Sequence, residues 1–177
     1  EFRNINSNLK DKNYFNNLIK WTGVKDVKIV DETIFLSLTE EIKKDCYNTS
    51  LVSSNINLEF LKFEKVFSTN ECANIETRIQ YFKYFNGHQN GGRIEWLNNR
   101  IYLTIGDYNV WELPQNDKSV FGKIIEIDVD KKNYKIISKG HRNQQGLKVY
   151  SKNDKILIST EHGPKGGDEI NLIKITD

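Results

Sequence analysis

The stretch that decides the fold is "GRIEWLNNRIYLTI", residues 92–105. Its two strand-like runs, "GRIEWL" and "RIYLTI", flank Asn98-Asn99, and asparagine tolerates the positive φ that a tight hairpin turn requires. The same pattern recurs in "VKDVKIV" with "TIFLSL", across Asp31-Glu32, and in "GLKVYS" with "KILIST", across residues 152–154. The sequence therefore predicts three copies of one β-hairpin unit.

Further strand-like runs follow each hairpin. They are "TSLVSSNI" and "LEFLKFEKV" after the first, "GKIIEIDV" and "YKIISKG" after the second, and "DEINLIKIT" alone after the third. The unit repeats roughly every 53 to 67 residues, and four antiparallel strands at such a period are typical of a β-propeller blade. We therefore expect an all-β fold with about three blades of a β-propeller in a single partial domain, residues 1–177. The expected ranges are an N-terminal segment, 1–23, and blades at 24–66, 92–138 and 146–177, of which the third lacks its last strand.

Two points of architecture stay open. A β-sandwich also has many short strands, although long loops at 67–91, 106–121 and 161–167, recurring at the same place in each unit, favour the propeller. The run "NYFNNLIKW" predicts either a short helix or a leftover outer strand. Because propellers close with about four to eight blades, we expect the chain to be part of a larger propeller or to self-associate through its open blade edges.

Composition excludes several classes of protein. The 177 residues hold 26 basic and 24 acidic side chains, for a net charge of +2, and no Lys/Arg block reaches the length typical of nucleic-acid binders, so no nucleic-acid partner is expected. No apolar run approaches the roughly 18 residues that a membrane span needs. There is no methionine, so we expect a removed leader or a segment of a longer protein. Cys46 and Cys72 form either a disulfide or two buried thiols.

All three histidines, His88, His141 and His162, lie in glycine-flanked loops. His88 in "NGHQNGGRI" suits a general base, because imidazole titrates near neutral pH and the neighbouring glycines let a ligand approach the backbone. Asp107, after the next strand, either orients His88 or caps a turn. A loop histidine also often binds only a backbone carbonyl, so a structural role stays open for each.

Two further loops carry candidate ligand groups. Arg142 and Asn143 in "GHRNQQGL" suit a grip on a carboxylate or a quinone oxygen, and Arg142 equally suits a salt bridge between blades. In "STEHGPKGGDEINLI", residues 159–173, the Gly163 and Pro164 carbonyls suit a hard cation such as Ca²⁺. Asp168 and Glu169 could instead tie that loop down through its own N–H groups.

Taken together and in order, "HQNGGRI", "NNRIYLTIGD", "GKIIEID", "GHRNQQGL" and "EHGPKGGDEINLI" resemble the soluble quinoprotein glucose/aldose sugar dehydrogenase family, also called the glucose/sorbosone dehydrogenase family. The resemblance covers residues 86–173 well and 20–85 loosely. It implies a six-bladed β-propeller, periplasmic or secreted, that binds pyrroloquinoline quinone (PQQ) and Ca²⁺ and oxidises an aldose sugar by hydride transfer to the quinone.

The resemblance also implies roles for single residues. His88 takes the proton of the sugar hydroxyl, Asp107 supports that base, and Arg142 polarises the carbonyls that receive hydride. Gln89, Arg142 and Asn143 contact the cofactor, and the Gly163 and Pro164 carbonyls hold its Ca²⁺. The family's remaining cofactor contacts come from later blades, so the chain is expected to supply about half of a site. The electron acceptor stays unknown, and the alternative is a non-catalytic propeller that binds a glycan or a protein.

Overall fold

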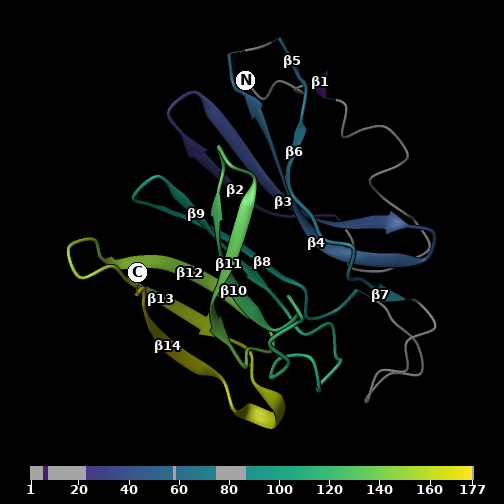
Figure 1. The fold of residues 1–177 in the computed structure, drawn as a ribbon, viewed down its shortest axis with the longest axis vertical. Helices are drawn as coiled ribbons and strands as arrows, with labels where there is room; N and C mark the ends of the chain where they lie inside the picture. The colour runs from purple at the N-terminus through teal and green to yellow at the C-terminus, as the bar shows by residue number, and fades with distance from the viewer. Residues whose placement is uncertain (1–5, 8–22, 58, 75–86, 177) are drawn as a thin grey trace.

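The computed structural model describes residues 6–7, 23–57, 59–74 and 87–176. Within these ranges the fold is all-β. Three antiparallel sheets of three to five strands follow one another along the chain, from blue through green to yellow in Figure 1. The run "NYFNNLIKW" lies outside the described residues.

The first sheet has the order β2-β3-β4-β6, and the short strand β7 also pairs with β4. Its strands are β2 (Gly23–Val30), β3 (Thr33–Lys43), β4 (Cys46–Asn55), β6 (Glu64–Phe67) and β7 (Ala73–Asn74). The sheet opens with the predicted hairpin, in which Asp31 adopts a φ of 49° at the turn. A separate parallel pair joins β1 (Asn6–Ser7) to β5 (Phe60–Leu61).

Two predictions for the first sheet are wrong. The long loops do not recur at the same place in each unit. Those at 106–121 and 161–167 follow the second strand of their sheets, whereas β3 continues to Lys43 and β4 begins at Cys46 after a two-residue turn in which Asp45 takes a φ of 59°. The run "LEFLKFEKV" is also not one strand. It divides into β5 and β6, which pair with different partners, β1 and β4.

The second sheet has the order β11-β10-β9-β8 and contains the hairpin that decides the fold. Its strands are β8 (Gly91–Leu97), β9 (Arg100–Ile105), β10 (Lys123–Asp128) and β11 (Asn133–Lys139). Asn98 and Asn99 take φ values of 52° and 59°, which confirms the predicted turn. Four antiparallel strands in this order are the predicted blade.

The third sheet has three strands, as predicted. They are β12 (Gln144–Ser151), β13 (Ile156–Glu161) and β14 (Glu169–Lys174), in that order. The long loop between β13 and β14 contains a single 3₁₀ turn, Pro164–Gly166.

The strands β8, β9 and β10 of the second sheet are buried on both faces, which is the packing expected of a blade between two others. Along β9, Ile101, Leu103 and Ile105 pack with side chains of the first sheet, such as Phe35. The intervening Tyr102 joins a second core with side chains of the third sheet. Successive side chains of β9 point to opposite faces of the sheet and therefore pack into two different cores.

Polar contacts fix β8 against its neighbours on either side. The Glu95 carboxylate, 4% exposed, binds Lys28 Nζ of β2, and its other oxygen lies 3.5 Å from Lys148 Nζ of β12. Asp26 Oδ2 accepts a hydrogen bond of 2.9 Å from Ile94 N. These contacts set the positions of β2, β8 and β12 relative to one another.

The outer faces of the first and third sheets keep apolar side chains at the surface. Val27 and Ile29 on β2, and Ile170 and Leu172 on β14, are all more than half exposed. The self-association predicted for open blade edges stays a prediction. Among the described residues, no helix is long and apolar enough to cross a membrane.

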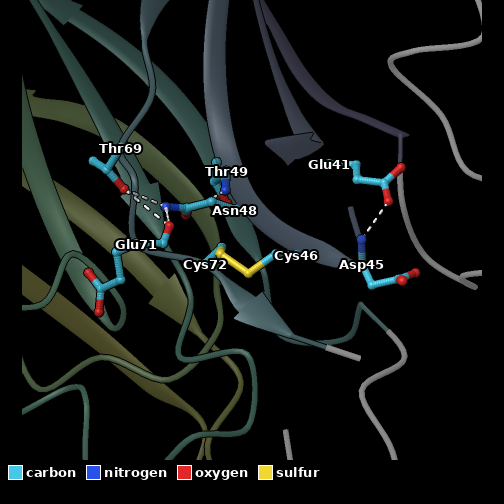
Figure 2. The surroundings of a disulfide bond; sticks show 8 residues. All are labelled: Glu41, Asp45, Cys46, Asn48, Thr49, Thr69, Glu71 and Cys72. Carbon is cyan, nitrogen blue, oxygen red and sulfur yellow. Dashed lines mark hydrogen bonds between the residues drawn. A yellow bond between two sulfur atoms is a disulfide. The ribbon is translucent and has the colours of Figure 1, made fainter. Parts of the chain in front are cut away.

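Cys46 and Cys72 form a disulfide, which decides between the two alternatives that the sequence left open. Figure 2 shows that the bond fastens the start of β4 to the segment before β7, where Asn48 Nδ2 also binds Thr69 Oγ1 (2.7 Å) and the Glu71 carbonyl. The Glu71 carboxylate in turn accepts from Ser119 Oγ (2.6 Å) and Val120 N (2.7 Å). The disulfide therefore supports the loop between β9 and β10.

Replacing both cysteines by alanine is expected to lower the free energy of unfolding of the full-length protein. The bond joins residues 26 apart, and loop closure of that length is worth about 3 to 4 kcal/mol. Urea unfolding of the wild type and the Cys46→Ala/Cys72→Ala variant measures the difference. A reductant serves as the control, since it should destabilise only the wild type. Equal unfolding midpoints in the two oxidised proteins would contradict the prediction.

Candidate active site

A cavity of about 620 Å³ opens where β2, β8 and β12 begin. Residues 87–91, residues 142–145 and His162, directly after β13, contribute to its wall. The described lining residues are Val24, Lys25, Gly87, His88, Gln89, Asn90, Gly91, Arg93, Arg142, Asn143, Gln145 and His162. The sequence-predicted residues His88, Gln89, Arg142 and Asn143 therefore share one cavity, whereas Asp107, Gly163 and Pro164 do not line it.

The lining carries three cationic side chains and no carboxylate among its described residues. Burial, and then the neighbouring Arg93, lower the pKa of Lys25 to about 8. Arg93 reaches across the site, because its Nη1 donates to the Lys25 carbonyl (2.9 Å) and its Nη2 to Gln145 Oε1 (2.8 Å). The cavity is therefore electropositive and suited to an anionic ligand.

His88 lies in the loop just before β8, and its side chain is half-buried. Burial lowers the pKa of His88, and the charge of Lys25 lowers it further. The imidazole is therefore neutral at neutral pH, which is the form that accepts a proton.

Gln89 connects the cavity wall to the loop behind it. Its backbone has a φ of 57°, and its carbonyl accepts a hydrogen bond of 3.0 Å from Tyr108 N. With the amide turned so that its neighbours are satisfied, Nε2 donates to Asp107 Oδ1 (2.8 Å) and Oε1 accepts from Arg142 Nη2. The Gln89 amide thus links the Asp107 carboxyl group to the Arg142 guanidinium group.

Asp107 lies behind the cavity wall and is only 2% exposed. Burial raises the pKa of its carboxyl from 3.8 to about 7, although Asn109 N donates to Oδ1 at 2.7 Å and Arg142 opposes the rise. The Asp107 side chain contacts Asn109 and Gln89, its N donates to the Arg142 carbonyl at 2.8 Å, and its carbonyl accepts from Val110 N at 2.9 Å. The structure thus links Asp107 to the cavity through Gln89, and its support of His88 remains a prediction.

Arg142 turns its guanidinium toward the loop after β13. Nη1 donates to the His162 carbonyl (2.9 Å) and to the Gly163 carbonyl (3.2 Å). Asn143 is held by Gln145, whose Nε2 donates to Asn143 Oδ1 at 2.7 Å. A positive group therefore lies against the carbonyl of Gly163 in this structure.

The loop that follows β13 is tightly folded. Gly163 N donates to Asp168 Oδ1 (3.0 Å), and Gly167 N donates to the Pro164 carbonyl (3.1 Å). A Cβ at position 163 would lie 1.7 Å from the Gly167 carbonyl oxygen, so only glycine fits there. Asp168 therefore holds the loop closed through a backbone N–H group, as the sequence suggested for Asp168 and Glu169.

Lys25 and Gln145 are cavity residues that the sequence analysis missed. Lys25 lies within "VKDVKIV", which predicts an ordinary strand, but β2 contains a register shift between Val24 and Asp26. That shift places Lys25 in the lining while Asp26 and Lys28 both contact β8. The broken alternation of apolar residues at this point is the signal that could have revealed it.

Comparison with known proteins shows the family of the chain. Residues 22–177 match the family described as glucose/sorbosone dehydrogenase. The chain belongs to this family. An uncharacterized protein of Synechocystis sp. is 34% identical over a match that covers 50% of this chain and 27% of the relative.

Solved structures of aldose sugar dehydrogenases share the fold of this chain. The apo form of the soluble aldose sugar dehydrogenase of Escherichia coli superposes with a TM-score of 0.71 at 23% identity, over 88% of this chain and 48% of that one. The PQQ-bound aldose sugar dehydrogenase of Streptomyces coelicolor gives 0.68 at 22% identity, over 94% and 49%. The three sheets thus correspond to about half of a six-bladed propeller, and the chain spans about half the length of these relatives.

Asp107→Asn is expected to flatten the pH dependence of stability of the cofactor-free protein. The unfolded carboxyl ionises near pH 3.8, whereas the folded one stays protonated up to about pH 7, so folding loses stability as the pH rises between these values. The full loss corresponds to about 4 kcal/mol, and asparagine avoids it while it still accepts from Asn109 N. Urea unfolding between about pH 5 and pH 8 measures the slope.

The matched control is Asp154→Asn, which removes an exposed carboxylate in the turn between β12 and β13 and should leave the slope unchanged. An Asp107→Asn protein with the wild-type slope would show that burial of this charge carries no cost.

Proposed function

We propose that this chain provides about half of the active site of a PQQ-dependent aldose dehydrogenase. The observation that carries the proposal is the electropositive cavity, in which His88, Gln89, Arg142 and Asn143 meet. Membership of the glucose/sorbosone dehydrogenase family and the fold shared with a PQQ-bound relative support it. The substrate is an aldose sugar.

The residues present fit a planar anionic cofactor. Lys25, Arg93 and Arg142 offer positive charge to the carboxylates of PQQ, and the Asn143 amide offers a neutral donor. When bound, the quinone supplies an acceptor for two electrons and Ca²⁺ supplies a Lewis acid beside it. In the proposal, Gln89, Arg142 and Asn143 hold the cofactor.

The fit to Ca²⁺ is limited to backbone oxygens. The Arg142 guanidinium already lies against the Gly163 carbonyl, so this oxygen faces a positive group. The Pro164 carbonyl accepts one hydrogen bond, from Gly167 N, and a carbonyl has a second lone pair. Two carbonyls are fewer than the about six to eight oxygens that Ca²⁺ takes, so the proposal leaves the others to the cofactor and water.

His88 acts as the general base in this proposal. Its neutral imidazole lines the cavity and takes the proton from the sugar hydroxyl as the adjacent carbon loses hydride. Burial, and then the charge of Lys25, lower the pKa of His88 and keep it neutral, and Asp107 supports the wall behind it through Gln89. The disulfide supports an oxidising compartment, and we propose a periplasmic or secreted protein.

His88→Asn is expected to abolish most of the dye-linked aldose oxidation of the full-length protein loaded with PQQ and Ca²⁺. Loss of a general base lowers kcat by about 100- to 10,000-fold, while PQQ binding should persist, because the cationic side chains remain. Steady-state kinetics and a PQQ titration measure the two effects separately.

The comparison variant is His162→Asn, which changes an exposed histidine whose ring faces Asp168. Its kcat should fall by less than about tenfold, since no proton transfer is assigned to it. Equal losses in the two variants would remove the special role of His88. A wild-type protein that binds PQQ but oxidises no aldose would contradict the enzyme proposal and support a non-catalytic propeller.

A further inference from the structure

Glu161, the last residue of β13, is a buried carboxylate that the proposed chemistry does not use. It is 6% exposed and lies between two loops of the candidate site, the one at 141–143 and its own, at 161–167. Buried carboxylates are expensive unless they are paired and hydrogen-bonded. The partners of Glu161 therefore show what it holds in place.

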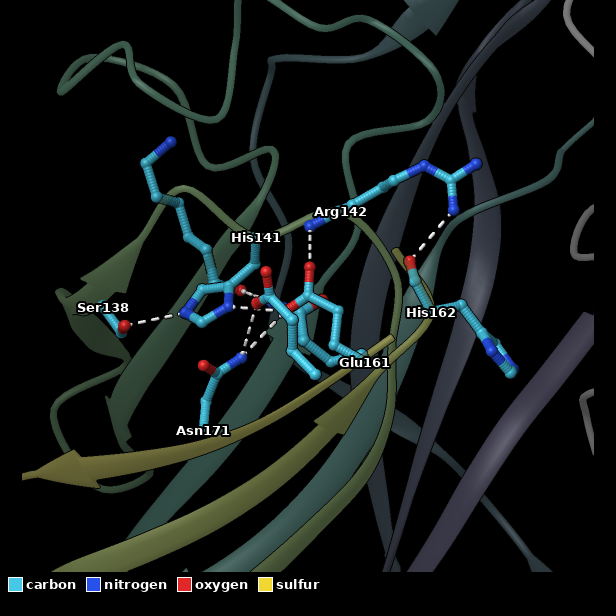
Figure 3. A network of polar contacts seen from close by, with 9 residues as sticks. Ser138, His141, Arg142, Glu161, His162 and Asn171 are labelled. Carbon is cyan, nitrogen blue, oxygen red and sulfur yellow. Dashed lines mark hydrogen bonds and ion pairs between the residues drawn. The ribbon is translucent and has the colours of Figure 1, made fainter. Parts of the chain in front are cut away.

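The two oxygens of Glu161 bind different parts of the 141–143 loop. Oε1 accepts from Arg142 N, and Oε2 lies 2.8 Å from His141 Nδ1. Figure 3 shows these bonds converging on the carboxylate, with Asn171 Nδ2 of β14 at 3.4 Å from Oε2. One side chain thus fixes the backbone of Arg142 and the ring that precedes it.

His141 is fixed from its other side as well. Its Nε2 lies 2.7 Å from Ser138 Oγ on β11, its backbone N donates to the Gly122 carbonyl (3.0 Å), and it is 6% exposed. Ser138, His141 and Glu161 follow one another in the order of a hydrolase triad. The candidate cavity, however, is lined by Arg142 and Asn143 and not by Ser138. The chain of bonds therefore serves position rather than attack on a substrate.

The contacts between the two loops are reciprocal. The Glu161 carboxylate binds the backbone of Arg142, and the Arg142 guanidinium binds the carbonyls of His162 and Gly163, the two residues after Glu161. His162 N also donates to the Asn143 carbonyl (3.1 Å). Movement of either loop would therefore displace the cofactor-facing groups on both.

We infer that Glu161 and His141 form a positioning pair that sets the place of Arg142 and Asn143 toward the cofactor. Neither residue is among those that line the candidate cavity. Glu161 acts by fixing the Arg142 backbone, and His141 acts by fixing Glu161. The inference rests on the proposed function, since the groups being placed are those proposed to bind PQQ.

The test is a PQQ titration of the full-length protein in the presence of CaCl₂, followed by absorbance, on wild type, Glu161→Gln, Arg142→Gln and the double variant. Glu161→Gln puts an amide where two donors converge, and it should weaken PQQ binding by about 10- to 100-fold, as loss of an outer partner does at other sites. Since part of the effect of Glu161 passes through Arg142, the loss of PQQ affinity in the double variant should be smaller than the two single losses combined.

The His141 variants test the pair without changing the carboxylate. Asparagine keeps a donor near the place of Nδ1, whereas leucine of similar size has none. His141→Asn should therefore stay within about threefold of wild type, and His141→Leu should match Glu161→Gln. The control is Glu169→Gln, an exposed carboxylate at the start of β14, which should bind PQQ as the wild type does.

The outcomes separate the two levels of the argument. Wild type that binds no PQQ overturns the proposed function and this inference with it. Wild type that binds PQQ, with Glu161→Gln binding equally well or with losses that add in the double variant, overturns the inference alone. If Glu161→Gln does not fold, the His141→Asn and His141→Leu pair decides, and equal affinities in that pair overturn the inference.

Discussion

The candidate site depends on a close backbone approach between two loops of the second sheet. The Gln89 carbonyl oxygen lies 1.9 Å from where a Cβ at position 106 would stand, so the contact requires Gly106. Across it, Tyr108 N donates to the Gln89 carbonyl, and Asp107 lies beside the Gln89 amide. Any larger residue at 106 would push the His88 loop away from its support. The cavity wall is therefore set by backbone, and the side chains are placed upon it.

A second layer of contacts spreads this placement over three sheets. Arg93 and Glu95, both on β8, each bind groups from β2 and β12. The central strand therefore fixes the positions of its two neighbours at two points along its length. The disulfide and Glu71 support the β9–β10 loop from the first sheet. Positive charge gathers in the cavity, while the Asp107 carboxyl, whose pKa burial raises to about 7, and the Glu161 carboxylate, which is bonded to His141, lie behind its wall. The positive lining suits an anionic ligand.

Much of the fold could be predicted from the sequence, because hairpin turns and strand alternation are local properties. The two residues Asn98-Asn99 are enough to predict the geometry of their turn, and the order of the apolar runs predicts the three strands of the last sheet. The β3–β4 turn was missed because Lys44-Asp45 carries no glycine or proline that would mark a turn in the sequence. The division of "LEFLKFEKV" into two strands depends on pairing partners that are distant in the chain.

The candidate site was predicted unevenly for the same reason. Motif residues such as His88 and Arg142 could be named, but Lys25 enters the cavity only through a register shift, and Glu161 acquires its role only from tertiary contacts. The measurement that tests the account most directly is the stoichiometry of PQQ binding to the full-length protein, by calorimetric titration with and without Ca²⁺. The account predicts one PQQ per chain, with affinity that falls sharply in an Arg142→Gln/Asn143→Ala variant. No heat of binding in the wild type, or affinity unchanged in that variant, would contradict it.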